Sequence, residues 1–456
     1  MTTAVDRFLG IRYATAGRFE APELLPFDRS SSSWDTAGPL SPQVPGMMEQ
    51  MLGIDAGSMS EDCLYLNVFA PAGAAQGDDL PVLYWIHGGA YLNGGGSVPW
   101  YDGSRLAGRS HVVVTINYRL GALGFLGGGN WGTLDQICGL QWVQQHIAGF
   151  GGDPGNVTIF GESAGGSAVV SLLAAPAAQG LFHRAWAMSP SILQLRTLDT
   201  ADDWARKFLA HAGVESLEQA KELPLDQLLG AQAATIAMPN TAYDMFSPAA
   251  GGEGITHDLL GAAAANPVPL SIGTNRDENL LFMAFDPGLA SAGEDRWVAF
   301  LDEHFPDRAA EVRAAYEAAR PGGRPVTLIA AVTTDHTFRR PAQRLAEARS
   351  EQGNDTWMYW FTWASPAFGG ALGSAHALDI PFAFDNIDAP GAAMLLGDGP
   401  ELQDIATRFA DEISAFGRDG KATWPAFDPS SRAPLRIDSA FELLHDPEPE
   451  LRALHG

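Results

Sequence analysis

A serine flanked by two glycines has the clearest chemical potential in this sequence. Ser163 stands in Gly-Glu-Ser-Ala-Gly, residues 161–165, directly after the β-branched and aromatic run Val157–Phe160. That run is typical of a buried strand, and the apolar residues after the serine suit a buried helix. Strand, Gly-x-Ser-x-Gly and helix together make a nucleophile elbow, whose glycines permit a very tight turn with the serine hydroxyl exposed at its tip. The pattern predicts a nucleophilic serine, while an ordinary glycine-rich turn of an α/β protein is the alternative.

A nucleophilic serine needs a base to accept its proton, and the base needs an acid to orient it. In α/β-hydrolases these follow along the chain in the order Ser, Asp or Glu, His. The chain has eleven histidines, so a downstream histidine is not informative by itself. His376 is favoured because it lies in a glycine-containing loop, residues 373–382, after the strand-like run Trp357–Trp363.

Two adjacent carboxylates are candidates for the orienting acid. Asp277 and Glu278 follow the apolar run Pro269–Gly273, which we expect to be a strand. The carboxyl ends of strands are where sites are built in open α/β sheets. The residues alone do not choose between the two acids, and a solvated loop is the alternative for both.

Acyl transfer also requires amide donors for the developing oxyanion, each contributing roughly 3–4 kcal/mol. One source is the amide after the nucleophile, here Ala164, and the other is a Gly-rich loop after an earlier strand. Trp-Ile-His-Gly-Gly-Ala-Tyr, residues 85–91, supplies such a loop at the end of the strand-like run Pro81–Ile86. Its small residues let the backbone approach a substrate carbonyl, although the same residues could form an ordinary turn.

Strand-like and helix-like runs alternate along the chain, which predicts an α/β fold with a mostly parallel sheet covered by helices on both faces. The predicted strands are Leu64–Phe69, Pro81–Ile86, Val112–Asn117, Val157–Phe160, Ala185–Met188, Pro269–Gly273 and Trp357–Trp363. The predicted helices are an amphipathic one at Thr133–Ala148, then Asp202–His211, Arg308–Ala319 and Glu401–Phe416. Because no long linker interrupts this pattern, we expect residues 1–456 to form one domain with helical insertions after the fifth strand.

The composition narrows the class of protein. The net charge of −26 argues against nucleic acid or an anionic membrane surface as a partner. The N-terminus lacks a basic region followed by an apolar one, and no apolar run reaches the roughly 18 residues of a membrane span, so we expect a soluble, cytoplasmic protein. Cys63 and Cys138 form no metal-ligand spacing. We therefore predict neither a metal nor a cofactor.

Taken together, these motifs resemble the type-B carboxylesterase (cholinesterase-like) family, especially its bacterial para-nitrobenzyl-esterase-like members. The resemblance extends almost from end to end. Its matching segments are FLGIRYA (8–14), SEDCLYLNV (60–68), WIHGGAY (85–91), NYRLG (117–121), LDQ (134–136), FGGDPGNVTIFGESAGG (150–166), GTNRDE (273–278), HALDIPF (376–382) and WPAF (424–427).

The resemblance implies an α/β-hydrolase fold and the hydrolysis of small-molecule carboxylic esters through an acyl-enzyme. The catalytic triad that it implies is Ser163, Glu278 and His376. The oxyanion amides that it implies are those of Gly89, Ala90 and Ala164. The neighbouring Gly88 is not part of this implied set.

The chain also departs from the family pattern. Many members pair the cysteine of S-E-D-C with an earlier one, but Ser41 stands at that place here, so Cys63 is expected to be unpaired. Asn279 and Asp379 replace a glycine and a glutamate of the family motifs. The resemblance begins at Phe8, and we expect most of the family's N-terminal hairpin to be missing.

Two other functions remain open at this point. The same triad could serve an amidase or a carbamate hydrolase, because the sequence does not fix the leaving group. The family also includes non-catalytic adhesion proteins, but these typically lose a triad residue, and this chain keeps all three.

Overall fold

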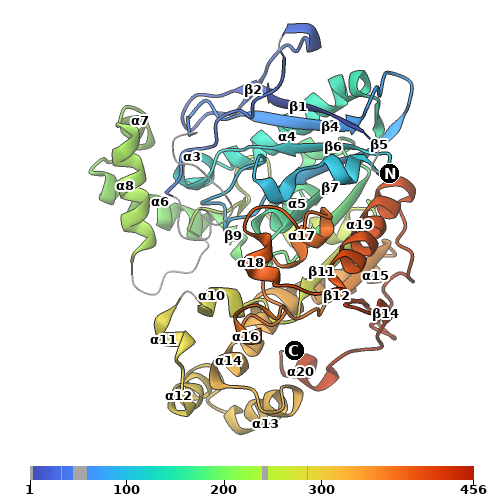
Figure 1. Ribbon diagram of the computed structural model, residues 1–456. Helices are drawn as coiled ribbons and strands as arrows, with labels where there is room; N and C mark the ends of the chain where they lie inside the picture. Colours follow the sequence, from blue (N-terminus) through green and yellow to red (C-terminus); the bar gives the residue numbers. More distant parts are fainter. Residues whose placement is uncertain (1–3, 32, 45–58, 239–244, 285, 456) are drawn as a thin grey trace.

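A ten-stranded sheet with helices on both faces forms the centre of the molecule in a computed structural model that describes residues 4–31, 33–44, 59–238, 245–284 and 286–455 (Figure 1). The strand order is β1-β4-β6-β5-β7-β8-β11-β12-β13-β14. The seven strands from β6 to β13 in that order run parallel, whereas β1, β4 and β14 pair antiparallel with their neighbours. The prediction of a mostly parallel sheet is confirmed.

The strands of the large sheet are β1 Val5–Arg12, β4 Tyr65–Pro71, β5 Leu80–Ile86, β6 Val112–Ile116, β7 Gly152–Glu162, β8 Arg184–Met188, β11 Leu270–Asn275, β12 Thr356–Phe361, β13 Leu435–Ile437 and β14 Glu442–Leu443. Two small sheets pair β2 Ala14–Thr15 with β3 Glu23–Leu24, and β9 Arg196–Thr197 with β10 Ala249–Ala250.

The α-helices are α2 Ser104–Ala107, α3 Gly121–Phe125, α4 Trp131–His146, α5 Ala164–Leu173, α6 Leu198–Ala212, α7 Leu217–Lys221, α8 Leu225–Ile236, α9 Leu259–Ala265, α10 Leu280–Ala284, α11 Pro287–Ala290, α12 Glu294–His304, α13 Ala309–Ala319, α14 Pro325–Thr334, α15 Arg340–Glu351, α16 Ala367–Gly370, α17 Asp379–Ala383, α18 Ala392–Leu396, α19 Leu402–Asp419 and α20 Pro449–Leu454. A π-helical turn, Asp335–Arg339, joins α14 to α15.

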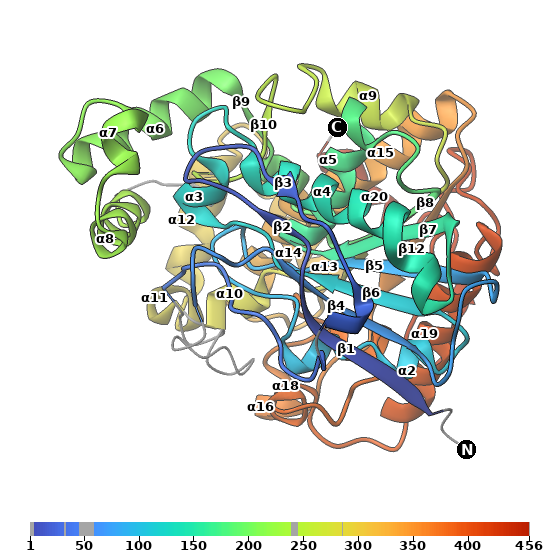
Figure 2. The ribbon, with the colours of Figure 1, turned by 90° about the horizontal axis from the view of Figure 1, so that it is seen from above.

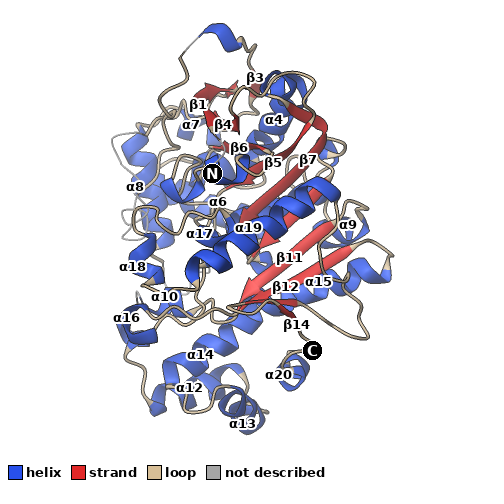
Figure 3. Cartoon of the chain, turned by 45° about the vertical axis from the view of Figure 1, so that its right-hand side comes forward, coloured by secondary structure: helices blue, strands red, loops and turns tan. Residues whose placement is uncertain are grey.

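The two faces of the sheet carry separate hydrophobic cores. In β5, Val82, Tyr84 and Ile86 belong to one core cluster, while Leu83 and Trp85 belong to the other. This alternation follows from the two-residue period of a strand, and both sets are fully buried, as expected for a parallel strand covered on both sides. Figure 2 shows α4, α5 and α15 together on one side of the sheet, and α19 crosses the other side in Figure 3.

The seven predicted strands are all present, with ends that differ by a few residues. The main difference is β7, which begins at Gly152 rather than Val157. The predicted helices correspond to α4, α6, α13 and α19, and the helical insertions do follow the fifth predicted strand, β8.

The amphipathic interpretation of the helix at 133–148 is wrong. Most of α4 is buried around its circumference, including the polar residues Asp135 and Gln136. Asp135 can be buried because it accepts hydrogen bonds from the Arg119 guanidinium at 2.7 and 2.8 Å and from the Arg119 amide at 3.0 Å. A paired charge therefore occupies a position where the sequence pattern suggested solvent.

Both cysteines are buried and free, as expected for Cys63. Among the described residues, the helices are too short or too polar to span a lipid bilayer.

Candidate active site

Ser163 occupies a strained turn between β7 and α5. Its φ of 59° and ψ of −121° lie outside the regions that a residue with a side chain normally adopts. The flanking glycines are required by contact: a Cβ on Gly165 would lie 2.0 Å from the carbonyl oxygen of Ile86, and one on Gly161 would lie 2.6 Å from Gly165 backbone atoms. The turn therefore has the geometry of a nucleophile elbow, and it leaves the serine partly exposed.

Glu278 and His376 meet on the loops that follow two neighbouring strands, β11 and β12. His376 Nδ1 lies 2.6 Å from Glu278 Oε2, and the two side chains are 5% and 0% exposed. The second carboxylate oxygen of Glu278 accepts the Asn275 amide at 2.7 Å, and the His376 amide donates to the Glu278 carbonyl at 3.2 Å. The carboxylate is thus held from two sides, and it fixes the orientation of the imidazole.

The other ring nitrogen of His376 faces the elbow. Nε2 lies 3.1 Å from Oε1 of Glu162, the residue immediately before Ser163. The contact lacks hydrogen-bond geometry, and within the described chain Nε2 has no hydrogen-bond partner, Ser163 included. Bonds of this kind often tighten only when substrate is bound. The imidazole therefore lies at the elbow, with Nδ1 held by Glu278 and Nε2 free to accept a proton.

The buried carboxyl groups around the imidazole shift one another's pKa values. Burial would lower the pKa of His376, but the carboxylates of Glu162 and Glu278 raise it to about 9. Burial raises the pKa of Glu162 to about 8 and, together with the Glu278 charge, the pKa of Asp379 to about 7. Because the charges of Glu162 and Asp379 help to raise the pKa of His376, protonation of either carboxylate lowers that pKa.

The Gly-rich loop after β5 packs directly on the elbow. A Cβ on Gly88 would lie 2.7 Å from the Glu162 carbonyl oxygen and 3.1 Å from Ser163 Cβ. Gly89 and Ala90 have positive φ values of 106° and 55°, and their amides donate to no other backbone group of the described residues. Ala164 is the first residue of α5, where an amide has no acceptor within the helix. Three amides are therefore available beside Ser163.

The buried side chain of His87 restrains the Gly-rich loop through a contact with the Gly88 carbonyl. It is fully buried, which lowers its pKa to about 4 and keeps the ring neutral, and it stacks on Tyr118 with ring centroids 4.5 Å apart. Its Nδ1 lies 2.7 Å from the Gly88 carbonyl oxygen. That carbonyl and the Gly89 amide belong to one planar peptide unit and point in opposite directions, so holding the carbonyl fixes the direction of the amide.

Comparison with known proteins places these residues in a family. The carboxylesterase family model matches residues 1–446. The chain is 35% identical to the para-nitrobenzyl esterase of Bacillus subtilis, over 98% of this chain and 94% of that protein. The chain belongs to the carboxylesterase family. It is a carboxylic-ester hydrolase with the α/β-hydrolase fold.

Other carboxylesterase relatives agree with this assignment. The phenmedipham hydrolase of Pseudarthrobacter oxydans is 33% identical over 85% of this chain and 81% of its own length. Among solved structures, a carboxylesterase of Geobacillus stearothermophilus superposes with a TM-score of 0.86 at 34% identity, covering 100% of this chain and 97% of that one. A thermophilic para-nitrobenzyl esterase gives a TM-score of 0.84 at 33% identity, covering 99% and 96%.

Several residues around the esterase site were missed by sequence reasoning. Glu162 stands at a variable position of the elbow motif, and its place beside Ser163 was the available signal. Asn275 donates from its side chain to the Ala375 carbonyl at 2.8 Å and to Asp379 at 3.2 Å, and both Asn275 and Asp379 lay within quoted motifs. Phe282 and Phe338 pack on the imidazole with ring centroids 5.1 and 4.9 Å away, and no local pattern marked either residue.

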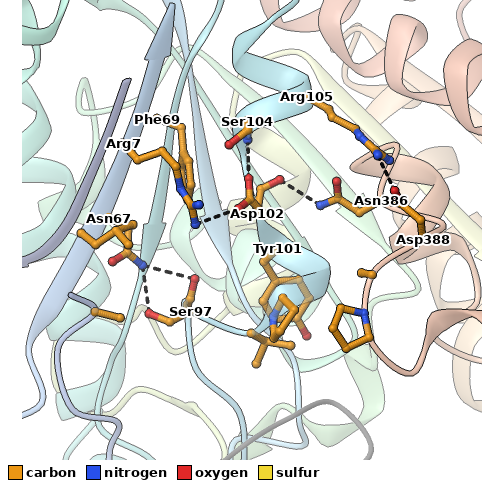
Figure 4. Close-up of a pocket in the computed structure, with 17 residues that line it drawn as sticks. Arg7, Asn67, Phe69, Ser97, Tyr101, Asp102, Ser104, Arg105, Asn386 and Asp388 are labelled. Carbon is orange, nitrogen blue, oxygen red and sulfur yellow. Dashed lines mark hydrogen bonds and ion pairs between the residues drawn. The ribbon is translucent and has the colours of Figure 1, made fainter. Parts of the chain in front are cut away.

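A cavity of about 490 Å³ lies elsewhere on the esterase, between the neighbouring strands β1 and β4 at one edge of the sheet and the segment before α18 (Figure 4). Its described lining residues do not include Ser163, Glu278 or His376. The charged groups that line it are already paired, Arg7 with Asp102 at 2.9 Å and Arg105 with Asp388 at 2.7 Å. We therefore do not place the ester chemistry in this cavity.

Proposed function

We propose that this carboxylesterase hydrolyses small-molecule esters through a Ser163–His376–Glu278 triad and an acyl-enzyme intermediate. The observation that best supports the proposal is the buried 2.6 Å contact between His376 Nδ1 and Glu278, on loops that bring Nε2 to the elbow that carries Ser163. We also propose that residues 1–456 act as one domain, since all three residues project from one sheet.

The first half of the reaction forms the acyl-enzyme. Neutral His376 accepts the Ser163 hydroxyl proton on Nε2 as the serine oxygen attacks the ester carbonyl carbon. Glu278 stabilises the imidazolium and keeps the remaining proton on Nδ1, the tautomer that leaves Nε2 free to act. The tetrahedral intermediate then collapses, the bond to the alcohol oxygen breaks, and the alcohol takes the proton from Nε2.

The second half returns the enzyme to its starting state. Water gives a proton to Nε2 and attacks the acyl carbon, and the bond to the serine oxygen then breaks. The serine recovers its proton and the carboxylic acid leaves. In both halves the negative oxygen accepts hydrogen bonds from the amides of Gly89, Ala90 and Ala164, each contributing roughly 3–4 kcal/mol.

Replacing the nucleophile tests the proposal. Ser163→Ala should fold normally and lose roughly 10⁶-fold in kcat on a chromogenic acetate or butyrate ester, because the covalent route is abolished. Ser171→Ala, within the following helix α5, is a matched control, because its hydroxyl donates to the Ser167 carbonyl at 2.9 Å. Substantial turnover by Ser163→Ala, with normal circular dichroism, would overturn the mechanism.

A further inference from the structure

A partly buried carboxylate near the C-terminus, with a side chain 19% exposed, bridges two arginines. Glu448, the residue before α20, forms ion pairs with Arg320 through one oxygen and with Arg339 through the other, the latter at 2.5 Å. The side chains of the two arginines are only 12% and 7% exposed. We call these three residues the Glu448 bridge. In Figure 1, α20 lies beside α13 and α14, below the sheet.

Arg339 connects the Glu448 bridge to the His376 ring through its neighbour Phe338. Arg339 ends the π-helical turn, donates to the Pro447 carbonyl at 2.8 Å and lies 4.1 Å from the centre of the Trp360 ring. Phe338 precedes it in the turn, and its ring centroid is 4.9 Å from that of His376. π-Helical turns are rare and are frequently found at functional sites. Fixing Arg339 therefore fixes one of the walls against which His376 rests.

Arg320 connects the Glu448 bridge to the loop that carries Glu278. Arg320 Nε lies 3.9 Å from Asp277 Oδ1. Asp277 accepts the Ser374 amide at 3.0 Å, and its own amide donates to the Ser374 carbonyl at 2.9 Å. Asp277 therefore joins the loop that carries Glu278 to the loop that carries His376. Arg320 and Arg276 supply the positive charges that stabilise this buried carboxylate.

From these contacts we propose that Glu448 is a positioning residue for the ester-hydrolysis reaction, acting from the C-terminal segment through Arg339 and Arg320 on the His376–Glu278 pair. The inference rests on the proposed roles of that pair. Glu448 does not touch the reacting atoms, so its contribution lies in keeping the imidazole where it can take the serine proton. Small displacements of a catalytic group are costly, up to roughly 10²-fold for about 1 Å.

The bridge also explains a strained residue. Glu448 has φ 59° and ψ 55°, a left-handed conformation that is uncommon for glutamate. The surrounding arginines hold the side chain, and they lower its pKa against the effect of burial, which raises it. Aspartate tolerates this backbone conformation better than glutamate does. Its side chain is one methylene shorter, so it keeps the charge without spanning both arginines.

The experiment compares Glu448→Gln and Glu448→Asp with Glu450→Gln, which removes an exposed carboxylate two residues away in α20. We measure kcat and KM on one chromogenic ester, near-UV circular dichroism, and the downfield proton resonance of His376 Nδ1–H. For the Gln variant we expect kcat to fall roughly tenfold with KM nearly unchanged, together with a moved or broadened resonance. Glu448→Asp should show a smaller change in the same direction, and Glu450→Gln should match the parent enzyme.

A purely structural role for Glu448 would lower thermal stability but leave kcat and the resonance unchanged in the folded protein, which would overturn the proposal. If Glu448→Gln fails to fold, Glu448→Asp decides the matter by the same readouts. His376→Ala is measured alongside. Retained activity in that variant would contradict the proposed function itself, whereas parent-like Glu448 variants beside an inactive His376→Ala would contradict the positioning role alone.

Discussion

Neutralising the proposed orienting acid by Glu278→Gln should disable this esterase without unfolding it. Glu278 uses one carboxylate oxygen for His376 Nδ1, at 2.6 Å, and the other for the Asn275 amide, at 2.7 Å. Glutamine has only one oxygen to offer. The backbone N–H of Asn275 can only donate a hydrogen bond, whereas the imidazole can carry its proton on either ring nitrogen. The side-chain oxygen of the introduced glutamine should therefore face Asn275, which leaves its NH₂ group pointing at Nδ1.

The magnitude follows from this tautomer switch. An NH₂ group facing Nδ1 requires Nδ1 to be the acceptor, so the ring proton sits on Nε2 and the ring cannot take the Ser163 proton. The imidazolium also loses the charge that stabilises it. The corresponding aspartate-to-asparagine change in a serine protease costs roughly 10⁴-fold in kcat, which is about 5.4 kcal/mol at 1.36 kcal/mol per tenfold.

The matched variant is Asp277→Asn, at the neighbouring carboxylate. Its oxygen can still accept the Ser374 amide, so we expect a loss of about tenfold or less. Steady-state kinetics of both purified variants on one chromogenic ester, with circular dichroism as the folding check, compare them directly. If Asp277→Asn lost far more activity than Glu278→Gln, the orienting role would belong to Asp277 and the reasoning above would be refuted.

Two further predictions concern pH and stability. Glu162→Gln removes a charge that raises the pKa of His376, so the imidazole should stay neutral down to a lower pH. The acidic limb of the kcat/KM profile should therefore move to lower pH. A limb that does not move, or that moves to higher pH, would show that Glu162 does not act on the imidazole. Asp135→Asn leaves the buried Arg119 guanidinium without its counter-charge and should lower the free energy of unfolding by about 3 kcal/mol in urea denaturation. The exposed pair of Asp203 with Lys207 offers a control, because Asp203→Asn should cause no measurable change, and equal effects of the two substitutions would contradict the burial argument.

Local patterns predicted the strands whose ends carry the proposed triad. Runs such as Val157–Phe160 are β-branched and apolar because a central parallel strand is buried on both faces, as β7 is here. The positions of Ser163, Glu278 and His376 followed from motifs at the ends of such strands. The identity of the acid did not follow from the residues alone, because Asp277 and Glu278 are neighbours and only the resemblance favoured the second.

The remaining features depend on contacts between distant segments, which no local pattern records. Asp135 is buried because Arg119 comes from another segment to pair with it, so the polar side of α4 was misread as solvent-facing. The approach of Glu162 to His376 requires the loop after β12 to reach the end of β7, although other strands lie between β7 and β12 in the sheet. The bridge from Glu448 to Arg320 spans 128 residues of sequence, and its charges looked like ordinary surface residues.

The most direct test of the central claim is to trap the acyl-enzyme. The enzyme is mixed with a slowly deacylating ester, quenched in acid and digested, and the peptides are analysed by mass spectrometry. We predict one acyl group per chain, located on Ser163 within the peptide that contains Gly-Glu-Ser-Ala-Gly, together with a burst of alcohol release of the same stoichiometry. An acyl group on another residue, or hydrolysis with neither burst nor adduct, would contradict the account.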